Sequence, residues 1–467
     1  MSTTWGPICR CFSFTRLSLV FALLAGLIPV SSAHAGGFRV YDQSATGTAQ
    51  GNAFTAQADD PCAIYYNPAG MTQLHGLQQS IGITFVGGHF DYRSPTGQTS
   101  RGDYGNSVAY PPPLNGYITA NLKDLGFNAL GDLTVGVGAI GAFGNMTQWP
   151  NNGPLSTAIT SAALQMVDVK PTLAYKLNDQ LSVGLGMDIY TFFNFWGEGQ
   201  AENKFNSAGT PGLPPAGTPL EVNGRDTSLG FNASFMYTPF RNADGKPLAN
   251  VGFVYRSQAT LHLNGQFLVN GRVAADDKIT LVLPQVFTGG IAIWPIRDQD
   301  REWKLELDVD YTDWKSVRNL NVHLSNGATI QNPQNWRGSY TAMIGTEYKW
   351  LRLEKLPQWE VALRGGIIQT QSPVPNATFN PALPDADRIG VSTGLGLFCK
   401  AGGHFLGLIP CGSSSTKKLV PKALALDVAA QVFFVEPRTV TGNVNPAVNG
   451  DYRTHEYVGA VNLRVNF

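Results

Sequence analysis

Histidines are the residues of this chain best suited to acid–base or metal chemistry, and they are scattered along the sequence. Those beyond residue 36 are His75, His89, His262, His323, His404 and His455. A hydrolase would need a nucleophile with its base beside it, and no serine forms a recognisable motif with any of these histidines. Their spacing also follows no metal-ligand pattern. The sequence therefore predicts no catalytic residue, no metal, no cofactor and no enzyme.

Four cations could serve a different chemistry, the binding of a carboxylate. They are Lys170, Arg256, Arg364 and Arg388. A charged donor binds a carboxylate strongly, so each is a candidate contact for an acidic ligand. Acidic side chains such as Asp188, Glu306 and Glu347 fall on the same face of the expected strands. An ion pair with such an acid is the alternative role for each cation.

An alternating pattern of side chains must position these groups. From Trp303 to Tyr311 the odd-numbered residues are apolar or aromatic, and the even-numbered ones are all charged. Because successive side chains of a strand point to opposite faces, one face would be apolar and the other would carry four charges. A membrane strand fits this pattern, with lipid on one face and a polar lumen on the other. Similar alternation covers 181–189, 229–237, 340–348 and 359–367.

About fourteen such strands are expected, an even number as in bacterial barrels. They lie near 78–92, 114–122, 132–143, 166–177, 181–198, 226–238, 250–268, 277–293, 302–314, 338–349, 359–370, 388–399, 422–435 and 454–467. Short turns such as 178–180 alternate with long polar loops. The long loops are 201–225, 315–337, 371–387 and 436–453, while 400–421 is long on the short-turn side. The sequence therefore predicts an all-β fold, a transmembrane antiparallel β-barrel over residues 77–467.

Composition limits the alternatives. The chain is 43% hydrophobic and 14% charged with 52 glycines. This composition is not typical of a disordered protein, and it is too polar for a helical membrane protein. Its 33 basic and 33 acidic residues give no reason to expect a nucleic-acid partner. A secreted β-sandwich would share the alternation, but it does not explain the charged face of 303–311.

Both ends of the chain indicate export to the outer membrane of a Gram-negative cell. Arg10 and Arg16 precede the uncharged run 17–30, and a small-x-small site at 33–35 follows, so residues 1–35 are predicted to be a signal peptide. The last strand, 457–467, has one apolar face and ends on an aromatic residue. This pattern resembles the signal read by the barrel assembly machinery, which we therefore expect as a partner, together with outer-membrane lipid.

Three cysteines remain in the exported chain. Cys399 and Cys411 flank a glycine-rich stretch and could form a disulfide in an oxidising compartment, whereas Cys62 lies far from them in the sequence. Spacing alone does not establish the geometry of a disulfide, so both the paired and the free state remain open for these two cysteines.

Residues 36–76 precede the first strand and do not alternate. They are rich in glycine and alanine and are punctuated by turn residues, including Asn67, Pro68 and Ala69. A barrel of fourteen strands is wide enough to leak unless its lumen is filled. We therefore expect this segment to be an N-terminal plug, or hatch, inside the barrel.

Several spaced motifs carry a family resemblance. The segment 58–71, with the sequence ADDPCAIYYNPAGM, resembles the hatch signature of the FadL-type outer-membrane transporters. In the same order as in that family follow the LVLP sequence at 281–284, the DYTDW sequence at 310–314, and the SPVP and PDADR sequences at 372–375 and 384–388. The family carries long-chain fatty acids and, in a TodX-like branch, monoaromatic hydrocarbons.

The resemblance implies a mechanism and its residues. In this family the N-terminus of the hatch reaches an apolar pocket, so Phe38, with Asn67, Pro68 and Ala69 of the hatch, is expected at the ligand site. A kinked third strand opens a passage through the barrel wall, which places Gly141, Phe143 and Gly144 at a lateral opening. Glycine weakens strand pairing, as such an opening requires. Ala142 stands where many relatives have proline, which leaves the sharpness of the kink open.

The resulting prediction is an outer-membrane transporter, acting as a monomer, for the passive uptake of hydrophobic compounds. Long-chain fatty acids are the first expected substrate and monoaromatic hydrocarbons the alternative. A lipid-modifying outer-membrane enzyme and a general porin are further alternatives. The enzyme lacks a visible nucleophile and base, and a general porin would have more strands and no hatch.

Overall fold

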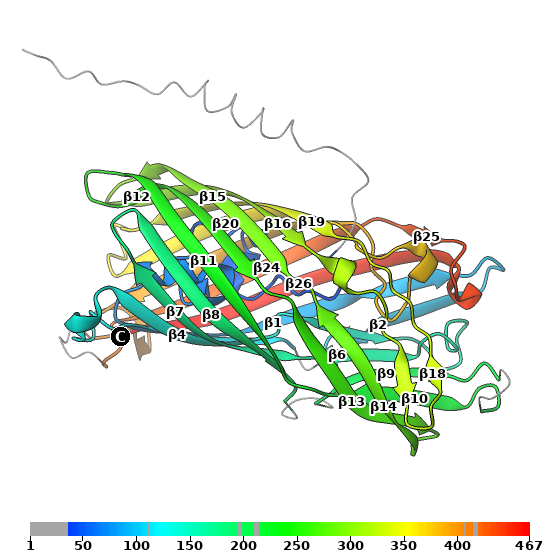
Figure 1. The fold of residues 1–467 in the computed structure, drawn as a ribbon. Helices are drawn as coiled ribbons and strands as arrows, with labels where there is room; N and C mark the ends of the chain where they lie inside the picture. The colour runs from blue at the N-terminus through cyan, green and yellow to red at the C-terminus, as the bar shows by residue number, and fades with distance from the viewer. Residues whose placement is uncertain (1–35, 111, 194–198, 210–213, 406, 414–418) are drawn as a thin grey trace, which may run out of the picture. The chain divides into compact units, whose positions relative to one another are not determined.

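Fourteen antiparallel strands form a closed barrel in the computed structural model (Figure 1). The structure describes residues 36–110, 112–193, 199–209, 214–405, 407–413 and 419–467. The predicted signal peptide lies outside these ranges. The barrel strands are β1 (Leu77–Arg93), β3 (Leu114–Asn121), β4 (Leu133–Ile140), β7 (Val167–Lys176), β8 (Leu181–Thr191), β11 (Ser228–Arg241), β12 (Pro247–Arg256), β15 (Val286–Arg297), β16 (Arg301–Thr312), β19 (Ser339–Trp350), β20 (Trp359–Thr370), β21 (Arg388–Lys400), β24 (Ala423–Val435) and β26 (Gly450–Asn466). Each pairs with the next, and β26 pairs with β1 to close the ring.

Further strands extend the sheet beyond one end of the barrel. They are β2 (Thr99–Val108), β5 (Gly144–Gln148), β6 (Ser161–Gln165), β9 (Ala201–Asn206), β10 (Pro219–Gly224), β13 (Ala259–Val269), β14 (Arg272–Leu283), β17 (Val322–Leu324), β18 (Thr329–Ile330) and β25 (Arg438–Val440). In Figure 1 the extension built from β9, β10, β13 and β14 lies at the end opposite the C-terminus. We call this end the loop end. The opposite, turn end is closed by short connections such as 177–180, 242–246 and 298–300.

The prediction of fourteen barrel strands is confirmed, but two of the predicted ranges each cover two strands of the structure. The range 250–268 contains β12 and β13, and 277–293 contains β14 and β15. Alternation continues through both breaks, so the pattern did not reveal them. The second break falls at Pro284, which cannot donate to a strand ladder. The predicted loops 201–225, 315–337 and 436–453 also hold short strands. Those of the first two loops pair within the extension of the sheet, and β25 of the third pairs with the first residues of β26.

The helices within the described ranges are short. They are α2 (Ala45–Thr48), α3 (Ala63–Tyr66) and the 3₁₀ turns η1 (Pro68–Gln73), η2 (Asn128–Leu130), η3 (Trp314–Ser316), η4 (Asn376–Thr378) and η5 (Pro446–Val448). Among the described residues, no helix has the length and apolar character needed to cross a membrane.

The two faces of the barrel strands differ as the alternation predicted. On β16, Val309 is 47% exposed on the outer face, whereas the neighbouring Asp308 is completely buried on the inner face. Large exposed apolar side chains recur around the outside, including Ile81, Leu185 and Leu229. An apolar exterior on antiparallel strands is the surface that lipid requires.

Residues 36–76 fill the lumen, and the inner face of β16 binds them. The backbone amides of Phe54 and Thr55 donate to Asp308 Oδ2, at 3.0 and 2.8 Å. The amide of Ala56 donates to Glu306 Oε1 at 2.6 Å. These carboxylates therefore satisfy backbone donors that would otherwise be buried without partners.

Glycines on the inner faces of other strands let the hatch backbone approach the wall. A Cβ atom built at Gly345 would lie 2.7 Å from the carbonyl oxygen of Gln50, and one built at Gly366 would overlap the Gln50 backbone. The preceding residue, Gly365, would place its Cβ no closer than 3.8 Å to any atom outside its own neighbours. Glycine is thus required at 366 by close contact, not by backbone conformation.

At the turn end, Cys399 and Cys411 form a disulfide with a Cα–Cα distance of 5.6 Å. It encloses the small hairpin of β22 (His404–Phe405) and β23 (Ile409–Pro410). This resolves the alternative left by the sequence and explains how a long connection is held on the short-turn side. Cys62 is free and buried in the hatch, where burial raises the pKa of its thiol well above the ordinary value.

Candidate functional site

The third barrel strand is interrupted where the opening was predicted. Strand β4 ends at Ile140, and β5 begins at Gly144. Across this break the chain pairs with the first residues of the hatch: the Val40 amide donates to the Ala142 carbonyl at 3.0 Å, and the Gly144 amide donates to the Phe38 carbonyl at 2.9 Å. We call residues 36–40 the hatch tip. The tip therefore supplies hydrogen bonds that a continuous strand would exchange with its neighbour.

A cavity of about 710 Å³ lies at this break, and we call it the kink cavity. Its lining includes the hatch tip, the ends of β4 and β5, Pro113 and Met166. Most of these groups are apolar or present backbone, as expected of a site for a hydrophobic ligand. The predicted opening residues Gly141, Phe143 and Gly144 all line it.

Aromatic rings surround Phe38 at the tip. Its ring centroid lies 4.7 Å from that of Trp314, 5.6 Å from Trp336 and 5.9 Å from Phe143. Phe38 itself is 7% exposed. Edge-to-face contacts at these separations are favourable for aromatic pairs, so Phe38 occupies an apolar socket at the end of the hatch.

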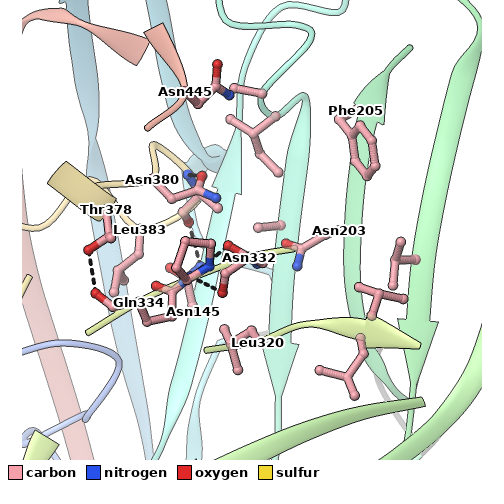
Figure 2. A pocket seen from close by; sticks show the side chains of 18 of the residues that line it. Asn145, Asn203, Phe205, Leu320, Asn332, Gln334, Thr378, Asn380, Leu383 and Asn445 are labelled. Carbon is pink, nitrogen blue, oxygen red and sulfur yellow. Dashed lines mark hydrogen bonds between the residues drawn. The ribbon is translucent and has the colours of Figure 1, made fainter. Parts of the chain in front are cut away.

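A second cavity of about 360 Å³ lies on the loop-end side of Phe38, and we call it the loop cavity. Phe38 and Trp336 line it, together with β9, β10 and segments of the long loops. Figure 2 shows the side chains of Asn145, Asn203 and Asn332 among its lining, beside Leu320 and Leu383. Its lining is therefore apolar with many amide groups, and Glu202 is the one ionisable residue that the described lining contains.

The two cavities adjoin. Asn145, Leu164 and Leu383 line both of them. Asn145 Nδ2 donates to the Ala382 carbonyl at 2.7 Å, which ties β5 to the loop 371–387 at this boundary (Figure 2). The hatch tip stands between the cavities, since Phe38 lines the loop cavity and its neighbours Gly37 and Arg39 line the kink cavity.

Three buried nitrogen donors around these cavities have no hydrogen-bond partner in the described part of the chain. They are the indole nitrogens of Trp314 and Trp336 and Nε of Arg388. Trp336 lines the loop cavity, and Arg388 lines the kink cavity. An unpaired buried donor is unfavourable, so an acceptor oxygen placed in these cavities could satisfy the donors of Trp336 and Arg388.

The four predicted carboxylate contacts lie in different surroundings. Lys170 binds Asp168 and Asp188, and Arg364 binds Glu347 and Asp427. Arg256 donates to the Tyr65 carbonyl and stacks on that ring at 4.5 Å. Arg388 binds Glu456 at 2.6 Å. Arg388 alone of the four lines either cavity, so the role of all four as carboxylate contacts stays a prediction.

The other predicted hatch residues hold the hatch in place. Asn67 Oδ1 accepts from the Ala69 amide at 3.1 Å, and Asn67 Nδ2 donates to the Thr55 carbonyl at 2.8 Å. Pro68 and Ala69 lie against Gly184 of β8. These residues do not line either cavity, and they link the hatch to the barrel wall.

A loop carboxylate reaches the hatch tip from the loop end. Asp385 lines the kink cavity, accepts from Ser372 Oγ at 2.6 Å, and also binds the Gly37 amide. Burial raises the pKa of Asp385 to about 6, although these hydrogen bonds favour its charged form. Its charge therefore changes within the range of weakly acidic media.

Trp336 is a site residue that the sequence did not identify. It lies in the polar loop between η3 and β19, where a lone aromatic residue between Asn335 and Arg337 is the one local signal. Its contact with Phe38 joins segments about 300 residues apart, which no local pattern encodes.

Comparisons with known proteins support these observations. A family described as "Outer membrane protein transport protein (OMPP1/FadL/TodX)" matches residues 26–400. The long-chain fatty acid transport protein of Escherichia coli O6:H1 is 23% identical over 432 residues, covering 82% of this chain and 87% of that protein. The crystal structure of a Pseudomonas aeruginosa FadL homologue has a TM-score of 0.70 at 19% identity, covering 92% of this chain and all of that one.

The Pseudomonas putida toluene transporter TodX has a TM-score of 0.59 at 15% identity, covering 94% of this chain and 100% of that one. Both structural matches agree with the barrel described above. The family match spans most of the chain and bears out the resemblance read from the hatch and loop motifs. The chain therefore belongs to the FadL/TodX family of outer-membrane transport proteins for hydrophobic compounds, and it is not an enzyme.

Proposed function

We propose that this protein takes up long-chain fatty acids by diffusion, through the loop cavity, past Phe38, into the kink cavity and out at the break 141–143. One observation carries the proposal: the two cavities share lining residues, and the hatch tip stands between them. A ligand that displaces Phe38 from its aromatic socket would pass from one cavity to the other.

The driving force is the transfer of an apolar chain out of water. Each CH₂ group buried in an apolar cavity contributes roughly 0.8 kcal/mol, so a long acyl chain can be captured from dilute solution. The apolar groups around Phe38, Ile159 and Leu281 in the loop cavity support this role. Because the same energy opposes release, the affinity of the kink cavity for the ligand must fall when the tip moves. A ligand shifts the equilibrium between the two positions of the tip only if it binds them with different affinities.

The carboxylate of a fatty acid would find donors along this path. Trp336 offers its indole N–H in the loop cavity, and Arg388 offers its Nε in the kink cavity. Glu456 offsets much of the charge of Arg388, so the interaction would be weak enough for the ligand to leave. We retain Arg388 as the proposed carboxylate contact.

Monoaromatic hydrocarbons are the second candidate substrate. The described lining of the loop cavity contains no lysine or arginine, which suits a ligand without charge. The aromatic socket formed by Trp314, Trp336 and Phe143 would accept a ring in place of Phe38. Both candidates would use the same path and the same lateral exit.

Uptake measurements test the proposal in cells that lack their own transporters. Labelled palmitate and labelled toluene would be supplied to cells with the wild type, Phe38→Asp, Gly144→Val or the control Phe127→Asp, whose ring is 58% exposed at the turn end. We expect the first two variants to lose palmitate uptake and the control to retain it, at equal amounts in the outer membrane. Uptake of toluene alone would select the second candidate, and uptake of neither compound by the wild type would contradict both.

A further inference from the structure

Two histidines from opposite ends of the chain face each other on the outside of the barrel. His89 of β1 and His455 of β26 are directly paired across the strands that close the ring. Their rings stack with centroids 4.5 Å apart and an interplanar angle of 25°. Asp91, two residues beyond His89 on the same face of β1, places Oδ2 3.5 Å from His89 Nε2. One donor atom from each of the three residues lies within 4.8 Å of the other two.

We propose that His89, His455 and Asp91 bind a transition-metal ion, with Zn²⁺ as the representative. Two imidazole nitrogens and one carboxylate oxygen are a ligand set that Zn²⁺ accepts, and a water molecule would complete a tetrahedral site. Zinc–nitrogen distances of about 2.0–2.1 Å require the donors to draw closer together. The side chains of His89 and Asp91 are 36% and 35% exposed, so small rotations achieve this without moving the strands.

The carboxylate of Asp91 is already oriented for this role. Its Oδ1 accepts from Arg101 Nε of β2 at 2.7 Å, while Oδ2 faces His89. Asp103 of β2 and Arg453 of β26 are the other charged residues paired with this group, opposite His89 and Asp91 respectively. The charges of Arg101 and Arg453 oppose those of Asp91 and Asp103. The two imidazoles would bind the ion as neutral ligands. The charged residues around them balance one another.

The site lies on the other side of the wall from the kink cavity. Phe90 and Glu456, which alternate with the metal-binding residues, point inward and line that cavity. On the outer face, the next large side chains toward the turn end are those of Phe85 and Tyr457, both exposed. A bound ion would thus be reached from the solution just beyond the lipid band, and it would cross-link β1 to β26 beside the ligand path.

Metal titration of the purified barrel in detergent, without a histidine tag, tests the proposal. We expect one Zn²⁺ per protein by calorimetry and a rise in Tm with ZnCl₂, since an ion that binds the folded state stabilises it. His89→Gln and His455→Gln should each weaken binding at least tenfold. His404→Gln and His262→Gln, which change exposed histidines elsewhere, should bind like the wild type.

Spectroscopy of the wild type provides a readout that does not depend on the variants folding. Co²⁺ in a site with two nitrogens and one carboxylate should give the visible absorption of a tetrahedral complex, and Zn²⁺ should displace it. Absence of Zn²⁺ binding at 100 µM metal, or equal binding by folded His89→Gln and the wild type, would overturn the proposal. Binding lost equally in the His404→Gln control would also overturn it.

Discussion

The two parts of the hatch are held to the barrel in different ways. Beyond the tip, residues 41–76 are fixed by backbone contacts with strand carboxylates and glycines, as at Asp308 and Gly366. The tip, residues 36–40, is held by ring contacts of Phe38, two backbone hydrogen bonds and the ion pair of Arg39 with Asp310 at 2.7 Å. Both cavities adjoin the tip. The proposed function gives these two parts different roles, with residues 41–76 closing the lumen and the tip controlling passage.

Displacing residues 41–76 of the hatch from the barrel wall should have the largest effect. In Gly366→Val the new side chain would occupy the space of the Gln50 backbone, which cannot move as a flexible side chain would. We expect the hatch to leave its site and the barrel to conduct ions, with a conductance well above the near-closed wild type in planar bilayers. Gly365→Val is the matched control, because its Cβ would make only ordinary van der Waals contacts, at 3.8 and 3.9 Å. Equal conductance in the two variants would contradict a hatch fixed by close contact.

Locking the tip should abolish uptake while leaving the lumen closed. Arg39 and Phe143 are bridge partners, and the flanking hydrogen bonds make them a non-hydrogen-bonded pair, whose Cα atoms lie about 4.5 Å apart. Arg39→Cys/Phe143→Cys should therefore form a disulfide. We expect palmitate uptake to be lost under oxidising conditions and to return on reduction. Each single variant and the wild type, treated with the same reductant, are the controls, and uptake through the locked form would show that the tip need not leave the break.

Removing one strand carboxylate should moderately weaken the attachment of hatch residues 41–76 to the barrel. Asp308→Ala would leave the amides of Phe54 and Thr55 without their acceptor, at about 1–3 kcal/mol for each buried donor. We expect a lower Tm and faster hydrogen exchange at residues 54–57, measured by mass spectrometry. Asp300→Ala in an exposed turn should change neither quantity. If exchange rose only at the tip, the division between the two parts would be wrong.

The smallest expected effect is a pH dependence at the tip. Because the pKa of Asp385 is about 6 in the folded protein and 3.8 for an ordinary aspartate, the folded state binds the proton more tightly. The stability contributed by protonation is complete below pH 3.8 and is lost as pH rises through 6. We expect the Tm of the wild type, relative to Asp385→Asn, to fall on the order of 2 °C between pH 4 and pH 7. Parallel Tm curves for the two proteins would exclude this role.

Local patterns predicted the barrel well because one physical rule acts along every strand. Lipid outside and hatch or lumen inside impose alternation, and Trp303–Tyr311 displays it without help from distant residues. The same rule failed at Pro284, where alternation runs through a break between β14 and β15. The break at 141–143 was predicted from family motifs, and glycine alone would not have specified it, since Gly141 and Gly144 have no positive φ angles.

Contacts between distant residues could not be predicted. No local pattern indicates that Trp336 packs on Phe38 or that His89 stacks on His455. The first contact depends on the position of the hatch tip inside the barrel, and the second on closure of the ring. Among the cations, the pattern placed Lys170 and Arg364 on the inner face. It could not show that Arg388, which is ion-paired as they are, lines a cavity whereas they do not.

The pairing of β1 with β26 also determines how the chain must fold. The two strands form one continuous ladder from Gln78 and Asn466 to Arg93 and Asp451, so the ring closes between segments at opposite ends of the chain. Contacts of such large sequence separation form slowly. Until they form, both strands present unpaired edges, which invite aggregation. Closure of the ring therefore joins two exposed edges, and the edge of β1 that β26 covers stays unpaired until β26 is present.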